Sequence, residues 1–367
     1  MNTVKSEHHP ADRRLNRLRQ LLPESRVDAF LLHTLPALRY YSGFTGDSAF
    51  LLVEKDRATF FTDGRYTTQA AGELPPDLTL VRIDSFIQLA ANLADRNITL
   101  LGVEEQSFSL WRSRELKKKI PGLEIVFCQQ QISTPRLCKD EEELALIKEA
   151  IAIAEGAYRQ AIARLKPGIT EQDLALELEY QMKRRGAEKS AFDLIVASGR
   201  RSALPHGIAS AKPIAPGDMI TIDFGARYQG YHSDQTCTVF LGEPEPDRKK
   251  VYQDVFLAQQ AGIKAARPGM DAKALDRIVR EVIEQAGHGD YFSHGTGHGV
   301  GLEIHEAPSI SSRSTDRLAA GMVFTIEPGC YFPHQWGIRL EDMVYLGEKG
   351  SRVLTTLDKR LEAAIIE

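Results

Sequence analysis

The segment HGTGHGVGLEIHE, residues 294–306, concentrates three histidines and four glycines in thirteen residues. Imidazoles at this density suggest metal binding or proton transfer. The zincin motif H-E-x-x-H also has two histidines four residues apart, but it lies on a helix. Here glycines surround the histidines, and each glycine inside a helix costs about 1 kcal/mol relative to alanine. The segment is therefore expected to be a loop or strand, and residues elsewhere must complete its chemistry.

Four acidic residues occupy matching places in two repeated segments. APGDMITIDFG and LAAGMVFTIEPG carry Asp223 and Glu327 at the same distance from a glycine. Each is followed by a second predicted strand: YHSDQTCTVF carries Asp234, and GIRLEDMVYL carries Glu341. Because side chains alternate along a strand, each acid in the first strands shares a face with a threonine, while isoleucine or phenylalanine lies on the other. Each half therefore offers a hairpin with one carboxylate per strand.

The helices that precede these hairpins repeat as well. LKPGITEQDLALELEYQMKRRG (165–186) matches ARPGMDAKALDRIVREVIEQAG (266–287), with Thr170 and Asp271 as candidate N-caps. A longer predicted helix, 141–165 or 248–266, comes before each segment. A repeat of this kind predicts a pseudo-twofold structure made of two facing halves. It would bring the four carboxylates together near the pseudo-axis.

Four clustered acids would repel one another and raise each other's pKa values. Divalent cations remove that repulsion, and two ions suit four carboxylates better than one. With an imidazole from residues 294–306, the site would be rich in oxygen ligands with one nitrogen. Mn²⁺ suits such a set, with Co²⁺ or Zn²⁺ as alternatives. Two such ions would hold a shared water with a lowered pKa, which predicts hydrolysis of an amide bond.

The motifs TIDFG, YHSDQT, HGTGHGVGLEIHE, TIEPG and GIRLED occur in this order and resemble the pita-bread metallopeptidases. That superfamily includes methionine aminopeptidase, aminopeptidase P and prolidase. The resemblance covers roughly 140–367. The segments YYSGFTGDSAFLL and TDGRY resemble the additional domain of the proline-specific branch. The resemblance implies an α/β N-terminal domain of the creatinase type, followed by an α+β pita-bread catalytic domain with an internal pseudo-twofold repeat.

The resemblance also assigns roles to residues of this chain. Asp223 would bind one metal ion, and Asp234 and Glu341 would bridge both. His298 would be the nitrogen ligand of the other ion, together with Glu327, which would also act as general base towards the bridging water. The remaining candidates from the resemblance are His206 and His305 beside the scissile bond, and His294 in a supporting or purely structural role. Alternation along the strand places Arg339 on the same face as Glu341, where it would orient that acid or contact substrate.

Several apolar, β-forming runs precede the repeat: 27–33, 48–54, 58–63, 78–83, 98–104 and 123–129. Helical patterns at 86–95 and 109–119 lie among them, which predicts a small α/β domain. Pro135 and the charged run KDEEE indicate a boundary. We expect an N-terminal capping domain over 1–132, a linker over 133–140 and the catalytic domain over 141–367.

The chain of 367 residues has 43% hydrophobic and 26% charged residues, which is ordinary for a globular protein. Its net charge of −4 gives no reason to expect nucleic acid or an anionic membrane as partner. The four scattered cysteines fit a reducing compartment. No apolar run approaches a membrane span, and MNTVKSEHHPADRRLNRL has no apolar signal core. We expect a cytoplasmic protein, with a homodimer as a family-based expectation.

The resemblance implies hydrolysis of the Xaa-Pro bond at the N-terminus of peptides whose second residue is proline, as in aminopeptidase P. The alternative is an Xaa-Pro dipeptidase, or prolidase. Some dipeptidases of the family have an arginine shortly after the HE-x-P segment. Here Ser309 occupies that place and Arg313 is the nearest basic residue, which favours the aminopeptidase. A clamp for the dipeptide carboxylate could still come from Arg339.

Two more distant alternatives are a non-catalytic pita-bread protein used for binding and a metal-free enzyme of the creatinase type. Relatives of the first kind have lost metal ligands. In this chain all five ligand positions hold residues able to bind metal. The intact ligand set therefore argues against both alternatives.

Overall fold

The computed structural model describes residues 10–366, so part of the polar N-terminal segment, residues 1–9, lies outside the described residues. The chain divides into two compact units between Arg136 and Leu137. This division falls inside the range predicted as a linker, although residues up to 136 still form short helices. The hydroxyl of Tyr41 donates to the carbonyl of Ile132 at 2.8 Å, which ties this segment to the first unit. The domain limits given above stay a prediction.

The first unit is built on a six-stranded mixed sheet in the order β4-β3-β2-β1-β5-β6. The neighbours β3 and β4, β1 and β5, and β5 and β6 are parallel, and the other pairs are antiparallel. Each strand falls within a run predicted from the sequence. Their bounds are β1 Ala29–Leu32, β2 Ala49–Glu54, β3 Ala58–Thr62, β4 Thr79–Arg82, β5 Leu100–Val103 and β6 Glu124–Phe127.

The helices of this unit include the two predicted ones. Phe86, Leu89 and Leu93 of α5 pack with Leu31 and Leu52 of the sheet in a buried core. The other helices lie in segments where no helix was predicted. The bounds are α1 Pro10–Gln20, α2 Leu22–Ser25, α3 Leu35–Ser42, α4 Thr67–Glu73, α5 Phe86–Ala94, α6 Leu110–Lys119, α7 Gln129–Ser133 and η1 Thr134–Arg136.

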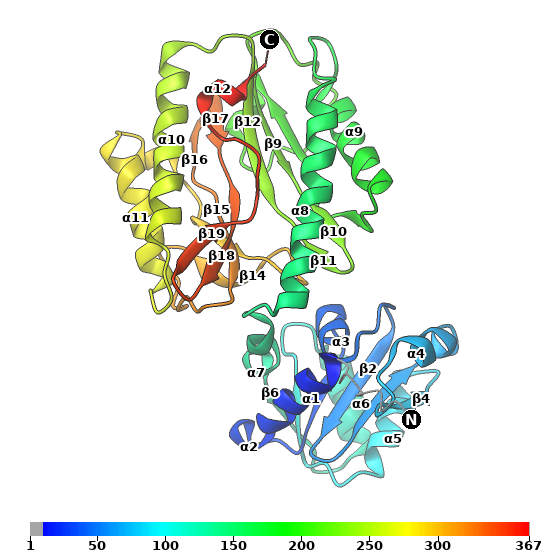
Figure 1. Ribbon diagram of the computed structural model, residues 1–367. Helices are drawn as coiled ribbons and strands as arrows, with labels where there is room; N and C mark the ends of the chain where they lie inside the picture. The colour runs from blue at the N-terminus through cyan, green and yellow to red at the C-terminus, as the bar shows by residue number, and fades with distance from the viewer. Residues whose placement is uncertain (1–9, 367) are drawn as a thin grey trace, which may run out of the picture. The chain divides into compact units, whose positions relative to one another are not determined.

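In the second unit, two helix pairs flank strands from both halves of the repeat (Figure 1). The pairs are α8 (Glu141–Ile162) with α9 (Glu171–Arg184), and α10 (Pro246–Ala265) with α11 (Ala272–Gln285). Two antiparallel hairpins, β9 with β12 and β15 with β18, form the core of the two larger sheets. The predicted pita-bread architecture with an internal repeat is confirmed.

The repeat extends to equivalent hydrogen bonds. The N–H of Gly168 donates to Ile214, and that of Gly269 donates to Leu318. Each of these glycines has a positive φ at the turn between two helices, a conformation that glycine adopts without strain. The caps differ, however. Thr170 caps its helix as predicted and forms a capping box with Asp173, whereas the side chain of Asp271 makes no cap hydrogen bond.

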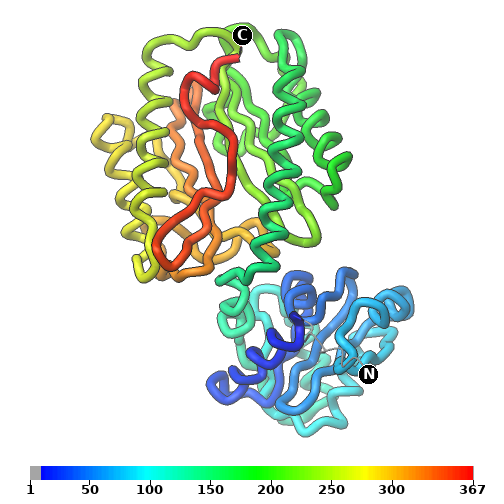
Figure 2. The backbone as a smooth tube through the Cα atoms, viewed as in Figure 1, coloured from blue at the N-terminus to red at the C-terminus, as the bar shows by residue number. Residues whose placement is uncertain are grey.

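The sheets of this unit have the orders β20-β12-β9-β8, β14-β13-β15-β18-β19, β11-β10-β7 and β16-β17. Figure 2 shows the C-terminal end of the tube returning to the hairpin of the first half, where β20 pairs with β12. Among residues 10–366, no helix is long and apolar enough to cross a membrane.

The remaining elements of the second unit are short. The strands are β7 Lys189–Ser190, β8 Ile195–Ser198, β9 Met219–Phe224, β10 Ala226–Tyr228, β11 Tyr231–His232, β12 Gln235–Leu241, β13 Gly297–Gly299, β14 Glu306–Ile310, β15 Val323–Ile326, β16 Gly329–Phe332, β17 Trp336–Arg339, β18 Asp342–Gly347, β19 Gly350–Val353 and β20 Ile365–Ile366. The helices are η2 Gly199–Ala203, η3 Gly289–Tyr291 and α12 Leu361–Ala364.

Candidate functional site

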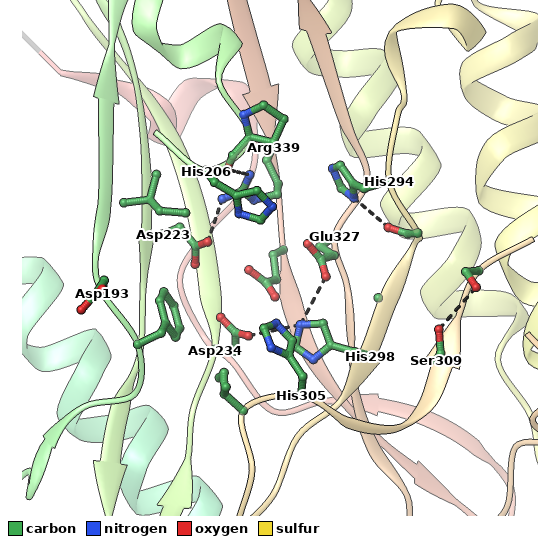
Figure 3. A pocket seen from close by; sticks show the side chains of 18 of the residues that line it. Asp193, His206, Asp223, Asp234, His294, His298, His305, Ser309, Glu327 and Arg339 are labelled. Atoms are coloured by element: carbon green, nitrogen blue, oxygen red, sulfur yellow. Dashed lines mark hydrogen bonds and ion pairs between the residues drawn. The ribbon is translucent and has the colours of Figure 1, made fainter. Parts of the chain in front are cut away.

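All nine candidate residues line one cavity of about 500 Å³ in the second unit. Most of them can be followed in Figure 3, where Asp223, Asp234, Glu327 and His298 surround a common space. The size is within the usual range for a small-molecule site. The candidate residues in the cavity wall are His206, Asp223, Asp234, His294, His298, His305, Glu327, Arg339 and Glu341.

The hairpins place the four acids at strand ends. Asp223 lies near the end of β9, and Asp234 directly precedes β12. Glu327 directly follows β15, and Glu341 directly precedes β18. The expected alternation holds, because the isoleucines beside Asp223 and Glu327 are fully buried in the two hydrophobic cores. Burial of those neighbours turns the carboxylates to the opposite face of each sheet.

His298 lies on β13, at the centre of the acids. Its Nε2 atom is 3.5 Å from Asp234 Oδ2 and 3.4 Å from Glu327 Oε1. The Nδ1–H donates to the carbonyl of Gly299, which leaves the Nε2 lone pair directed at the carboxylates. Burial lowers the pKa of His298, so the imidazole stays neutral and able to bind a cation.

Two glycines of residues 294–306 lie where the neighbouring backbone leaves no room for a side chain. A Cβ at Gly297 would lie 2.0 Å from the carbonyl oxygen of Thr325, and one at Gly299 would lie 2.2 Å from that of Ala307. Thr325 belongs to β15 and Ala307 to β14, so these neighbouring strands leave no room for a side chain at either glycine. The glycines thus allow three strands to pack tightly around His298.

The guanidinium of Arg339 forms hydrogen bonds with three side chains. Its Nη2 atom is 2.7 Å from Asp223 Oδ2, and its Nη1 atom donates to the hydroxyl of Tyr331 at 2.8 Å. Its Nε atom donates to Thr236, whose hydroxyl in turn donates to Glu341 Oε2 at 2.7 Å. Arg339 therefore bonds directly to Asp223, and it reaches Glu341 only through Thr236.

His294 lies beside this arginine network. Its Nδ1–H donates to the carbonyl of Gly295, so Nε2 accepts from the hydroxyl of Tyr331 at 3.0 Å. Burial and the nearby charge of Arg339 lower the pKa of His294 to about 4. A neutral His294 that accepts from Tyr331 fits a supporting place in the cavity wall. His305 is nearer the acids, with its ring 4.3 Å from that of His298.

Sequence reasoning missed the hydroxyl groups that hold the acids. Thr236 binds Glu341, Tyr331 binds Arg339, and Thr325 donates to Glu327 Oε1 at 3.3 Å. The alternation that placed Thr325 on the face of Glu327 was a usable signal for that residue. No such signal existed for Tyr331, because it contacts Arg339 and His294, which lie in other segments of the chain.

The residues present fit divalent cations. Asp234, His298 and Glu341 each offer one ligand atom, and these atoms lie within 4.8 Å of one another. Burial raises the pKa values of Asp234 and Glu341 well above normal, and the charges of the other carboxyls raise them further. Asp223 Oδ1 is buried without a hydrogen-bond partner among the described residues. A cation would satisfy this oxygen and remove the repulsion.

The cation-free site should make stability depend on pH. Burial raises the pKa of Glu327 to about 8, so the folded protein holds a proton that the unfolded chain has lost. Stability therefore falls as pH rises through the window between the unfolded and folded pKa values. Histidines with lowered pKa values oppose this below about pH 6.5. We therefore expect the melting temperature of chelated protein to fall between about pH 6.5 and 8.

Thermal denaturation in this pH window tests the expectation. The decline should be smaller in Glu327→Gln, whose amide does not titrate, and smaller in protein saturated with divalent cations. An equal slope in the chelated wild type and in Glu327→Gln would show that Glu327 does not carry the raised pKa.

Residues 145–348 match the model of metallopeptidase family M24, and residues 14–138 match the creatinase/prolidase N-terminal domain. The chain belongs to metallopeptidase family M24. It is 40% identical over 349 residues to the Xaa-Pro dipeptidase of Pyrococcus furiosus, which covers 95% of this chain and 99% of that protein. The family and the pita-bread fold implied by the five motifs are thereby confirmed.

Solved structures agree over both units. An Xaa-Pro dipeptidase from Bacillus anthracis matches with a TM-score of 0.93 at 38% identity, covering 97% of this chain and 100% of that chain. An X-Pro aminopeptidase from Thermotoga maritima matches with a TM-score of 0.88 at 39% identity, covering 96% and 99%. This M24 chain is thus a metallopeptidase, and similar structures carry both names, dipeptidase and aminopeptidase.

Proposed function

We propose that this protein removes the first residue from peptides whose second residue is proline, with two divalent cations held by the acid cluster. The observation that carries the proposal is the convergence of two carboxylates from each half of the repeat on His298, inside one cavity. Membership of family M24 and the Xaa-Pro peptidases among the relatives support the reaction and the bond that is cleaved.

In this proposal each half of the repeat supplies two cation ligands. Asp223 and Asp234 of the first half, and Glu327 and Glu341 of the second, would hold the two cations together with His298. When bound, the cations would polarise the scissile carbonyl and lower the pKa of a water molecule. This donor set combines oxygen ligands with one imidazole, which suits Mn²⁺ best, and Co²⁺ or Zn²⁺ could replace Mn²⁺.

The chain's own residues move the protons. Glu327 would take the proton of the attacking water, because its carboxylate lies in the cluster, with Oε1 3.4 Å from His298 Nε2. His206 and His305 lie in the cavity wall, where they can stabilise charge on the carbonyl oxygen or the departing imide nitrogen. His294 accepts a hydrogen bond from Tyr331 in the cavity wall. Arg339 forms an ion pair that positions Asp223.

The scarcity of positively charged side chains in the cavity wall favours peptides longer than dipeptides. A dipeptidase needs a positive group for the free carboxylate of its substrate. Of the lining residues within the described range, Arg339 alone is a lysine or arginine, and it is already bonded to Asp223 and Tyr331. Ser309 lines the cavity, whereas Arg313 does not. No free guanidinium is therefore available at this wall.

Xaa-Pro dipeptide hydrolysis is the second candidate. It is favoured by the relatives named Xaa-Pro dipeptidase, including those at 40% identity in sequence and at a TM-score of 0.93 in structure. Both candidates use the same acid cluster, so they differ only in what binds beyond the proline.

A peptide digest separates the two candidates. Protein stripped with chelator and reloaded with Mn²⁺ would meet an Xaa-Pro dipeptide, an Xaa-Pro-Xaa-Xaa peptide and an Xaa-Ala control, with products identified by mass spectrometry. We expect loss of the first residue from the longer peptide and no cleavage of the control. Cleavage of the dipeptide alone would make the protein a dipeptidase. Failure to cleave either proline peptide with cations bound would refute the proposed specificity.

Two expectations about the protein in its cell accompany this proposal. A homodimer follows the family pattern, and a cytoplasmic location follows from the scattered cysteines. Short peptides with proline second are the proposed partners, and nucleic acid and membranes are not among them.

A further inference from the structure

We propose that Lys139 is a positioning residue that acts through Glu306 to hold His305 in the wall of the active-site cavity. The inference rests on the proposed function in taking His305 as a group that contacts substrate. His305 lines the cavity, but it comes from the loop 300–305 between β13 and β14, whose residues belong to no helix or strand. Loops are more mobile than helices and strands, so the position of His305 depends on the contacts that neighbouring residues make.

Glu306, the next residue after His305, makes the contact. It does not line the cavity, and its side chain is only 4% exposed. Its Oε1 atom forms an ion pair with Lys139, whose side chain is 1% exposed. A Cβ at Gly301 would lie 2.6 Å from the same oxygen, so the carboxylate also lies against the backbone of the loop. The loop is therefore folded over the carboxylate that Lys139 holds.

Lys139 is itself anchored to a second part of the site. Its backbone N–H donates to the carbonyl of Gly321 at 2.8 Å, and its Nζ donates to the carbonyl of Leu137 at 3.3 Å. Gly321 lies just before β15, the strand that Glu327 directly follows. Lys139 thus links the strand that carries Glu327 to the loop that carries His305.

Glu306 has little other support. Its Oε2 atom is buried without a hydrogen-bond partner among residues 10–366. Loss of Lys139 would leave a buried carboxylate uncompensated, and the loop would move to expose it. His305 would move with the adjacent residue, and a displacement of about 1 Å in an active site can cost about 100-fold in rate.

The test uses Lys139→Met, Glu306→Gln and the double variant. The matched control is Glu155→Gln, because Glu155 is likewise buried, 3% exposed, and paired with Arg159, but does not line the cavity. With Mn²⁺ bound, we expect kcat for an Xaa-Pro peptide to fall at least about tenfold in Lys139→Met, with little change in KM. Glu155→Gln should keep the wild-type kcat.

The double variant separates positioning from stability. It has no unpaired charge, so its melting temperature should recover towards that of the wild type, while its kcat stays low. The double variant also serves if Lys139→Met fails to fold. A kcat for the double variant close to that of the wild type would overturn the proposal, because the ion pair would then contribute only stability.

A second readout needs no substrate. In protein labelled with ¹⁵N-histidine, the imidazole resonance of His305 can be assigned from its loss in His305→Ala. This resonance should shift in Lys139→Met and in the double variant, and should stay in place in Glu155→Gln. An unmoved resonance would contradict the positioning role. Failure of the wild type to cleave Xaa-Pro peptides, with the resonance shifted, would instead refute the proposed function alone.

Discussion

Replacement of Glu327 by glutamine is expected to lower kcat by about 10²–10⁴-fold, the usual contribution of a general base. Glutamine has nearly the same shape, but its amide cannot accept the proton of the attacking water. The fold should survive, because burial makes the charged form of the Glu327 carboxyl unfavourable in the cation-free site, and a neutral amide avoids that cost. Steady-state kinetics on an Xaa-Pro-Xaa-Xaa peptide would measure the loss.

Two controls accompany this variant. Bound metal must be measured, because glutamine is a weaker ligand than glutamate and loss of a cation would also lower kcat. Glu155→Gln controls for the general effect of neutralising a buried acid in the same unit. Activity near that of the wild type in Glu327→Gln, with cations bound, would rule out Glu327 as the general base.

Local patterns in the sequence predicted much of the fold. The six strands of the first unit and the helix pairs of the second were visible because apolar periodicity, caps and turn glycines act over a few residues. α3 and α4 were missed, since each is short and its pattern is weak; α4 buries little more than Ala70. Asp271 was correctly predicted to lie at the start of its helix, but its side chain makes no hydrogen bond that caps the helix.

The candidate site was predictable where the repeat fixed it. Equivalent hairpins required the four acids to lie at equivalent strand ends, and the structure brings them together with His298 in one cavity. Contacts between distant segments had no such signal. Arg339 was placed near Glu341 by alternation along its own strand, yet its direct partner is Asp223, 116 residues away. The ion pair of Lys139 and Glu306 spans 167 residues and left no local pattern.

Removal of divalent cations is expected to abolish activity, and their return should restore it. Without cations, burial and mutual repulsion raise the pKa values of Asp234, Glu341 and Glu327, so these carboxyls tend to hold protons. Cation binding must displace those protons, and affinity should therefore weaken as the pH falls. Chelated protein should show only background hydrolysis of an Xaa-Pro peptide.

The most direct measurement is a titration of chelated protein with Mn²⁺, in which peptide hydrolysis and bound metal per chain are followed together. If four carboxylates and His298 hold two catalytic cations, activity should rise until about two ions are bound per chain and then level off. Full activity with one ion per chain would contradict the dinuclear site. Undiminished activity in metal-free protein would contradict the whole account of the acid cluster.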